Sequence, residues 1–184
     1  MIDNGSFELK HCRLCKSKNL KLVIDLGESP PPNTLLKESD LKKPEPIFPL
    51  KVNFCEDCHQ LQLSHVVSPE LMFRNYAYVS STSPVMRSHF EKYAKSAVKR
   101  LGLKRGDLIV EIGSNDGFLL KQFKKLGMKV LGIDPARNIA RMATKEGVPT
   151  LPHFFNSKIA KQVAKKYGKA KLICGNNVFA HINE

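Results

Sequence analysis

The chain has 184 residues, of which 42% are hydrophobic, and its 30 lysines and arginines against 17 acidic residues give a formal net charge of +13. This length is enough for one full domain and a smaller one, each with its own core. The sequence has no apolar run of about 20 residues, which a membrane-spanning helix needs, and no signal-peptide pattern. We therefore expect a globular cytoplasmic protein and no membrane partner.

The positive charge raises the question of a nucleic-acid partner, because clustered lysines and arginines neutralise phosphates. However, the lysines in 121–125 and 158–166 fall between apolar positions at helical spacing. That pattern is typical of the solvated face of an amphipathic helix. The basic segments also lack interleaved aromatic residues, and the chain has no tryptophan. A basic zinc-ribbon protein that binds nucleic acid is therefore kept only as the alternative.

Residues 1–83 are predicted to form a small domain of short extended segments separated by turns. Extended segments are expected at 21–25, 50–54 and 61–63, with proline-rich interruptions at 30–33 and 43–46. This region has too few apolar residues to fold unaided. A bound metal would supply the missing stabilisation, because metal binding in such small domains is coupled to folding.

Two cysteine pairs, Cys12-x-x-Cys15 and Cys55-x-x-Cys58, indicate what that metal is. A gap of two residues lets both sulfurs of a pair reach one ion at about 2.3 Å, and two pairs complete a closed tetrahedral zinc site. A closed site leaves no position for water, so its role is structural. Either of two flanking histidines could replace one thiolate, and we favour four cysteines: His11 and His59.

From Pro84 onward the pattern changes to alternating helix and strand. Helices are expected at 90–101, 118–126, 139–143 and 159–164, and strands at 108–112, 130–133, near 150 and at 172–174. Repeated strand-helix units predict a parallel, doubly wound sheet over residues 84–184. The predicted fold class is thus α/β, with a small N-terminal zinc-binding domain followed by a Rossmann-like sheet. The fifth cysteine, Cys174, is expected to be a buried, inert strand residue.

A glycine-bearing turn, Glu111-Ile-Gly-Ser-Asn-Asp-Gly117, follows the first strand of this sheet. Gly113 lets the backbone turn tightly, and Gly117 opens the next helix, whose amide groups can face a nucleotide-like ligand. Asp134 ends the following strand, where a carboxylate can accept hydrogen bonds from both hydroxyls of a ribose. Taken alone, the turn could also reflect only the packing of a strand against a helix.

Asn115 and Asp116 stand where a dinucleotide-binding turn has small residues that admit a pyrophosphate. An uncharged or cationic part of a ligand fits there better than a phosphate. The sulfonium and amino acid moiety of S-adenosylmethionine meets this requirement, and Glu111 and Asp116 would supply negative charge near it.

With these segments in view, the chain resembles the zinc-containing sugar C-methyltransferases that act on nucleotide-linked 4-keto deoxysugars. The most particular matches are the Tyr76-x-Tyr78-x-Ser-Ser segment and the Ser-Asn-Asp-Gly turn. The other matching segments follow the family's order: Cys12-x-x-Cys15, Asp25-Leu-Gly27 with Pro30 to Asn33, Pro49-Leu50, Cys55-x-x-Cys58 with Leu61-Gln-Leu63, and Asn176-Asn-Val-Phe-Ala-His181.

The resemblance implies a methyl transfer to C3 of a nucleotide-linked 4-keto-6-deoxysugar through an enolate. It implies that Tyr76, Tyr78 and His181 assist catalysis as enolate stabilisers or acid-base groups. The residues expected to bind the cofactor are Glu111, Gly113, Asn115, Asp116, Gly117 and Asp134, with Phe155 near the adenine and Asn177 near the methionine end. The resemblance also implies a C-terminal domain that helps hold the sugar, and a glutamate-histidine pair, contributed from beyond residue 184, that is associated with proton abstraction. We therefore expect this chain to be an N-terminal fragment that turns over little substrate alone, or a non-catalytic remnant of the fold.

Overall fold

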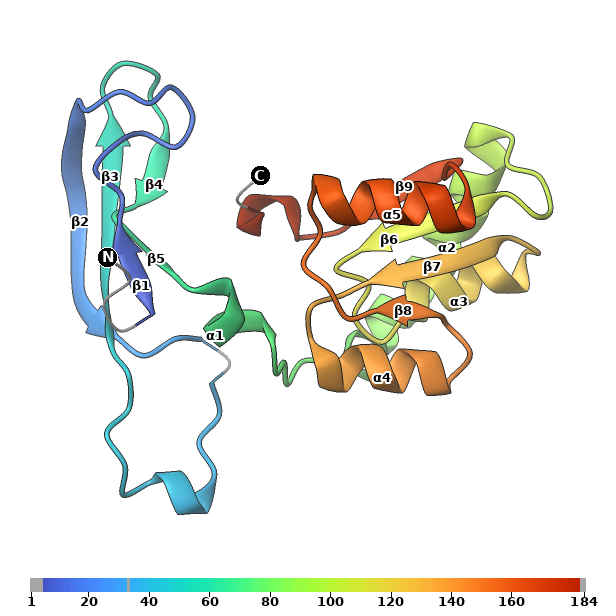
Figure 1. The fold of residues 1–184 in the computed structure, drawn as a ribbon, viewed down its shortest axis with the longest axis horizontal. Coiled ribbons are helices and arrows are strands. Elements are labelled where there is room, and N and C mark those ends of the chain that lie inside the picture. The colour runs from blue at the N-terminus through green and yellow to red at the C-terminus, as the bar shows by residue number, and fades with distance from the viewer. Residues whose placement is uncertain (1–4, 33, 183–184) are drawn as a thin grey trace. The chain divides into compact units, whose positions relative to one another are not determined.

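The computed structural model describes residues 5–32 and 34–182, and the chain divides into two compact units between Phe73 and Arg74 (Figure 1). Asn33, which belongs to one of the matching segments, lies outside the described residues. The predicted domain extents, 1–83 and 84–184, stay a prediction. Among the described residues, no helix combines the length and apolar character that crossing a membrane requires.

The N-terminal unit consists of two small antiparallel sheets (Figure 1). The predicted extended segments are confirmed as strands of the larger sheet, in the order β2-β3-β4. The elements of the unit are β1 (Ser6–Glu8), β2 (Leu20–Ser29), the 3-10 helix η1 (Glu38–Asp40), β3 (Phe48–Cys55), β4 (Leu61–Leu63), β5 (His65–Val67) and α1 (Pro69–Phe73).

The described part of the N-terminal unit buries few hydrophobic side chains. These are Phe48, Pro31 and two of the cysteines, Cys12 and Cys55. Leu22, at the outer strand of the larger sheet, is 52% exposed. Because burial of apolar surface is the main force that drives folding, this unit cannot rely on an apolar core for its stability. The structure therefore leads to the same expectation as the sequence, that a bound metal must stabilise this unit.

The second unit contains a parallel four-stranded sheet in the order β8-β7-β6-β9. Its strands and most of its helices lie within a few residues of the predicted ranges. The elements are the 3-10 helix η2 (Ser80–Thr82), α2 (Pro84–Leu101), β6 (Leu108–Ile112), α3 (Phe118–Lys125), β7 (Lys129–Ile133), α4 (Arg137–Lys145), β8 (Thr150–Leu151), α5 (Ser157–Tyr167), β9 (Leu172–Gly175) and the 3-10 helix η3 (Phe179–His181).

Both faces of this sheet are covered by helices, as the doubly wound pattern predicts. Alternate residues of β6 point to opposite faces, so Ile109 belongs to one buried cluster while Leu108 and Val110 belong to another. The first cluster includes residues of α2 and α3, and the second includes residues of α5. Figure 1 shows α5 on one side of the sheet and α2 and α3 on the other. Helices on two faces leave the carboxyl ends of the parallel strands as the open edge of the sheet.

The ends of α2 show why it begins and ends where it does. The hydroxyl of Ser83 accepts a hydrogen bond from the backbone N–H of Met86 at 3.4 Å, and Pro84 occupies the first turn. At the other end, Gly102 adopts a left-handed conformation. Ser83 is therefore a helix cap.

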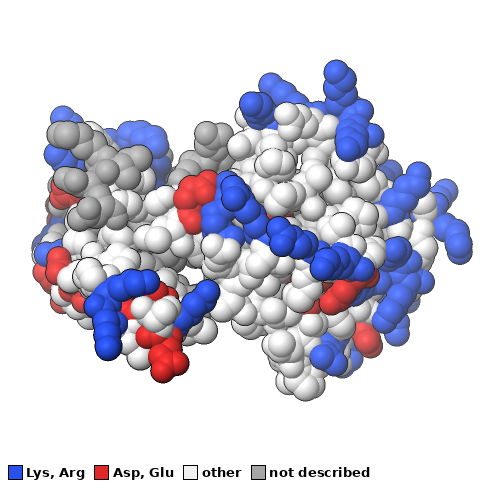
Figure 2. Space-filling view, turned by 60° about the horizontal axis from the view of Figure 1, so that its bottom comes forward, with Lys and Arg blue, Asp and Glu red and all other residues white. Residues whose placement is uncertain are grey.

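The basic residues have the distribution expected of solvated helix faces. Lys124 and Lys125 on α3 are exposed, as are Lys158, Lys161 and Lys165 on α5. Figure 2 shows one face of the molecule, on which lysine and arginine clearly outnumber the acidic side chains. The positive field thus comes from the outer faces of helices whose inner faces pack on the sheet.

Candidate functional site

The two cysteine pairs form turns of the same geometry. In each turn the residue after the second cysteine has a left-handed backbone, with φ +65° at Lys16 and +63° at His59. The backbone N–H of each of these residues donates to the carbonyl of the first cysteine of its pair, at 3.0 Å for Lys16 to Cys12 and 2.8 Å for His59 to Cys55. This repeated turn directs both sulfurs of a pair toward one point.

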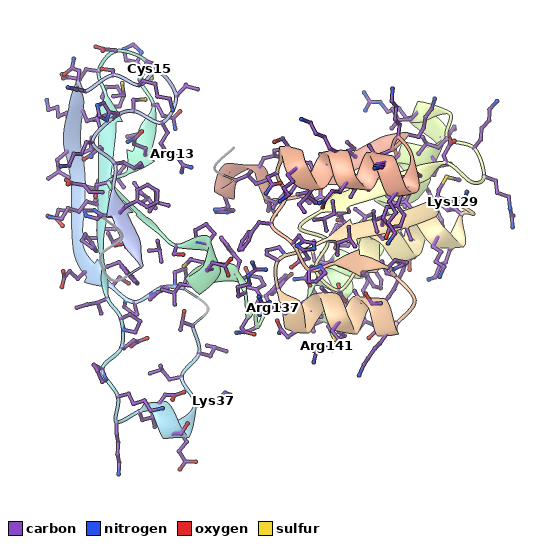
Figure 3. The ribbon with its side chains drawn as sticks, in the orientation of Figure 1. Arg13, Cys15, Lys37, Lys129, Arg137 and Arg141 are labelled. Carbon is purple, nitrogen blue, oxygen red and sulfur yellow. The ribbon has the colours of Figure 1, made fainter. Side chains whose placement is uncertain are left out.

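The four sulfur atoms lie within 4.8 Å of one another. Across the two pairs, Sγ of Cys12 is 3.5 Å from Sγ of Cys58, and Sγ of Cys15 is 3.6 Å from Sγ of Cys55. A zinc ion bound at about 2.3 Å to each sulfur of a tetrahedron would separate the sulfurs by about 3.8 Å. The arrangement therefore fits a tetrahedral zinc site. Figure 3 shows Cys15 at the end of the unit where the chain turns from β3 toward β4.

Histidine does not take a place in this cluster. Of the described residues, the four cysteines are the group that could hold a metal ion. His59 instead stacks on Phe54, with ring centroids 5.7 Å apart and planes 10° from parallel. A ring held against a neighbouring aromatic face is not directed at the sulfurs, so the four-cysteine alternative is the one that the structure supports.

Polar side chains that the sequence analysis did not single out hold the two turns together. The carboxylate of Asp57, in the second turn, accepts hydrogen bonds from the hydroxyl of Ser17 and from the side-chain amide of Asn19. Gln62, which is buried on β4, accepts from the backbone N–H of Arg13 and donates to the carbonyl of His11. These contacts join residues about 40 to 50 positions apart. No local sequence pattern reveals them.

The glycine-bearing turn follows β6 directly, as expected. Gly113 and Gly117 have φ values of +65° and +70°, which favour glycine. Each is also closely packed: a Cβ added to Gly113 would lie 2.9 Å from Cγ2 of Val178, and one added to Gly117 would lie 2.8 Å from Cγ1 of Val148. The sequence of the turn is therefore set by backbone conformation and by packing at once.

Three acidic side chains are buried around this turn. Glu111 is the last residue but one of β6, Asp116 lies in the turn, and Asp134 follows β7, and their exposed fractions are 4%, 2% and 6%. Both oxygens of Asp134 accept backbone hydrogen bonds, Oδ2 from Asn115 at 2.8 Å and Oδ1 from Ala136 at 2.9 Å. Parallel strands bring the ends of β6 and β7 together, so the turn and Asp134 meet at one edge of the sheet.

Among the described residues, three buried polar atoms at this edge have no hydrogen-bond partner: Oε2 of Glu111, Oγ of Ser114 and Oδ1 of Asp116. Buried polar atoms are almost always paired, so an orphaned set points to a bound group that completes it. Two carboxylate oxygens and one hydroxyl can accept hydrogen bonds from a cationic or hydroxyl-bearing ligand. This donor and acceptor set fits the amino acid and ribose parts of S-adenosylmethionine. Ser114 was not among the predicted site residues, although it lies inside the turn.

Burial also changes the ionisation of this cluster. The pKa of Glu111 is raised to about 8, chiefly by desolvation; a hydrogen bond from Asn176 at 3.5 Å opposes the rise, and the neighbouring charges of Asp116 and Asp134 contribute to it. Desolvation likewise raises the pKa of Asp134, against hydrogen bonds from the backbone of Ala136 and Asn115. A cationic ligand would favour the charged forms of both carboxylates.

The pH dependence of folding tests this assignment. In the unfolded chain Glu111 would titrate near pH ~4.3, and in the folded chain near pH 8. Between these values the folded state binds the extra proton, so the free energy of unfolding falls as pH rises and levels off above about pH 8. From about pH 6 to about pH 8 we expect a loss of roughly 2 kcal/mol in the wild type that Glu111→Gln removes.

Urea unfolding of the ligand-free chain, followed by the signal of its second unit at a series of pH values, measures this difference in the free energy of unfolding. Glu91→Gln, which removes an exposed carboxyl from α2, is the matched control and is expected to follow the wild-type curve. Parallel pH profiles for the wild type and Glu111→Gln would mean that the Glu111 carboxyl is not the buried group described above.

The predicted catalytic tyrosines belong to a segment whose backbone is held by asparagine side chains. Asn115 donates to the carbonyl of Tyr78 at 3.0 Å, and Asn138 donates to the carbonyl of Tyr76 at 2.8 Å. Tyr78 is 46% exposed, and Tyr76 is half-buried. The side-chain amide of Asn115, predicted to bind cofactor, is thus engaged with the protein backbone. Its role toward a cofactor stays a prediction.

The remaining predicted residues lie at the other strand ends of the sheet. Phe155 is partly buried and packs against the cluster under α5. Asn177 is exposed with φ +54°, and His181 is exposed at the end of η3. The chain after β9 packs closely on the turn, since Val178 lies against Gly113. Asn176, next to the predicted Asn177, is the asparagine that contacts Glu111.

A hollow of about 330 Å³ lies elsewhere on the unit, beside α4. Figure 3 shows two of its lining residues, Arg137 and Arg141, on that helix. Residues of the glycine-bearing turn do not line it. We give more weight to the turn, because the orphaned buried atoms lie there.

Comparison with known proteins finds a family for the zinc-binding region and a relative for nearly the whole chain. A family described as "Putative zinc binding domain" matches residues 12–73, so the predicted zinc-binding domain is confirmed. The chain is 38% identical over 174 residues to C-methyltransferase NovU of Streptomyces niveus. The alignment covers 95% of this chain and 41% of that protein, so the chain spans less than half of its relative's length. The predicted resemblance to C-methyltransferases is thereby confirmed.

Solved structures resemble parts of the chain at lower identity. Magnesium protoporphyrin IX methyltransferase from Synechocystis PCC 6803, solved with bound SAM, is 18% identical, with a TM-score of 0.39 over 53% of this chain and 49% of that one. An NAD-dependent alcohol dehydrogenase is 17% identical, with a TM-score of 0.38 over 65% of this chain and 44% of the other.

Proposed function

We propose that this chain is the zinc-binding and cofactor-binding part of an S-adenosylmethionine-dependent C-methyltransferase. The observation that carries the proposal is the set of buried, orphaned acceptor atoms at the turn after β6, on Glu111, Ser114 and Asp116. The name of the relative, a C-methyltransferase with 38% identity, supports the same reaction class. The four-cysteine site has no open position, so its role is to stabilise the N-terminal unit.

Different residues at the turn would bind different parts of the cofactor. Glu111 and Asp116 would face its sulfonium and the ammonium group of its amino acid moiety, and Asp134 would accept hydrogen bonds from the ribose hydroxyls. Each oxygen of Asp134 already accepts one backbone hydrogen bond and keeps a second lone pair for a hydroxyl. Phe155 would lie at the adenine, and Asn177 at the methionine end. When bound, S-adenosylmethionine supplies an electrophilic methyl group on a positively charged sulfur.

We further propose that the acceptor is a nucleotide-linked 4-keto-6-deoxysugar. The ketone at C4 makes the C3 proton acidic, and its removal leaves an enolate whose C3 carbon is the nucleophile. The negative charge that develops on the C4 oxygen needs a hydrogen-bond donor. The phenols of Tyr76 and Tyr78 and the imidazole of His181 are the candidate donors. Such an acceptor is a soluble metabolite, in keeping with a cytoplasmic enzyme.

Calorimetric titration of the zinc-loaded chain with S-adenosylhomocysteine tests the cofactor proposal. We expect saturable binding at one site, with no comparable binding of NAD⁺, because Asn115 and Asp116 disfavour a pyrophosphate. A single-stranded oligonucleotide serves as the third titrant. Binding of the oligonucleotide that weakens steeply with salt, without binding of S-adenosylhomocysteine, would overturn the proposal in favour of a nucleic-acid-binding protein.

A further inference from the structure

Residues 74–80, which we call the anchored segment, are held along the strand ends of the second unit by hydrogen bonds to their backbone, most of them made by asparagine side chains. The backbone N–H of Arg137 donates to the carbonyl of Arg74 at 3.1 Å. Asn138 then accepts from the N–H of Tyr76 at 3.3 Å and donates to its carbonyl at 2.8 Å. In Figure 1 this segment follows α1 and passes beside the start of α4. The first anchor is therefore on α4.

The second anchor is Asn115, in the turn after β6. Its Oδ1 accepts from the N–H of Ser80 at 2.9 Å, and its Nδ2 donates to the carbonyl of Tyr78 at 3.0 Å. The backbone N–H of the same residue donates to Oδ2 of Asp134 at 2.8 Å. Asn115 is thus connected both to the acidic cluster and to the segment that carries Tyr78.

The backbone of Asn115 strengthens this connection. Its φ of +50° lies in the left-handed region, which asparagine tolerates better than most residues. This conformation is fixed between Ser114, whose hydroxyl is one of the orphaned atoms, and Asp116, whose carboxylate is another. A ligand that engages these two neighbours must also restrict Asn115, and Asn115 holds residues 78–80 through both ends of its amide.

From this geometry we propose that Asn115 is a positioning residue that couples cofactor binding at the turn to the placement of Tyr78 and Ser80. The proposal rests on the cofactor site put forward above. Its physical basis is linkage: if binding at the turn stabilises the anchored segment, then fixing that segment strengthens binding by the same factor. Asn138 holds Tyr76 from a helix that lies outside the turn. It therefore anchors the segment without linking it to cofactor binding at the turn.

Hydrogen exchange of individual backbone amides, followed by NMR, measures directly how firmly each of the two asparagines holds the segment. The N–H of Ser80 reports on Asn115, and the N–H of Tyr76 reports on Asn138. In the wild type we expect S-adenosylhomocysteine to slow exchange at Ser80. Asn115→Gly keeps the left-handed backbone and removes the amide. We expect it to speed exchange at Ser80 about tenfold, to abolish the effect of the ligand there, and to weaken ligand binding about fivefold.

Asn138→Ala is the matched control, since it removes the other anchoring amide at an exposed helical position. It should speed exchange at Tyr76 and leave Ser80 exchange and ligand affinity within about twofold of the wild type. Asn115→Asp, which also tolerates the left-handed backbone but cannot donate to the Tyr78 carbonyl, serves if the glycine variant folds poorly. It keeps the acceptor for the Ser80 N–H, so it should weaken ligand binding in the same direction but change the exchange at Ser80 less than Asn115→Gly does.

Two results would overturn the coupling. One is ligand-induced slowing at Ser80 that persists in Asn115→Gly, and the other is an equal loss of affinity in Asn115→Gly and Asn138→Ala. Failure of the wild type to bind S-adenosylhomocysteine is a different outcome, because it refutes the cofactor site. In that case the exchange rates of the ligand-free chain still measure the effect of Asn115 and Asn138 on the anchored segment.

Discussion

Replacing Cys55 by serine is expected to unfold the N-terminal unit while the parallel sheet of the second unit persists. Among the described residues, the apolar side chains that this unit buries are Phe48, Cys12, Cys55 and Pro31, so burial of apolar surface contributes little to its stability. Structural zinc contributes on the order of 10 kcal/mol to the folding of small zinc domains at neutral pH. Loss of one ligand from a closed four-sulfur site therefore lowers the free energy of unfolding by more than the total that such a small unit has.

Zinc content and the NMR spectrum measure this effect together. The wild type should carry one zinc ion per chain, and Cys55→Ser should carry much less and lose chemical-shift dispersion for residues 5–73. Chelation of the wild type should give the same spectrum, and added zinc should reverse it. Cys174→Ala, which removes the buried cysteine of β9, is the control and should keep its zinc. Full zinc content and unchanged dispersion in Cys55→Ser would refute the structural role of the site.

Asp134→Ala is expected to weaken the binding of S-adenosylhomocysteine by about 100-fold or more, because hydrogen bonds to a charged acceptor contribute roughly 1.5 to 3 kcal/mol each. The substitution removes the proposed acceptor for two ribose hydroxyls. It also removes the acceptor for the backbone N–H of Asn115, which holds the turn in place. Both losses act in the same direction, so this change should exceed that of any other single substitution at the turn.

The control for this experiment is Asp107→Ala. Asp107 lies just before β6, at the opposite end of the strand from the turn, where its carboxylate accepts from the backbone N–H of Lys104. Both substitutions remove one negative charge, so a nonspecific effect of net charge would appear equally in both. Calorimetric affinities within about threefold of each other for Asp134→Ala and the control would show that Asp134 does not contact the ligand.

The parts of this molecule that local patterns encode could be predicted from the sequence. The spacing in Cys12-x-x-Cys15 is a property of one turn, and the nearly continuous apolar run at 108–112 is typical of a strand buried on both faces. The glycines of the turn were equally visible, because a left-handed backbone at Gly113 and Gly117 limits the residue type locally.

Contacts between distant residues could not be predicted in this way. Asp57 meets Ser17 and Asn19 only because two similar turns face one another across the zinc site. Asn138 reaches Tyr76 over 62 positions along the chain. Asn115 is predicted to face a cofactor because of its place in the turn, and no local pattern indicates that its side-chain amide also donates to the backbone of Tyr78. Polar side chains in loops follow no period, so the partner of each one depends on the assembled fold.

The most direct test of the account is a crystal structure of the zinc-loaded chain with S-adenosylhomocysteine bound. We predict that the ligand lies at the carboxyl ends of β6 and β7, with its ribose hydroxyls on Asp134 and its amino group facing Glu111 or Asp116. Ligand density in the hollow beside α4, next to Arg137 and Arg141, with an empty turn at saturating concentration, would contradict the central claim.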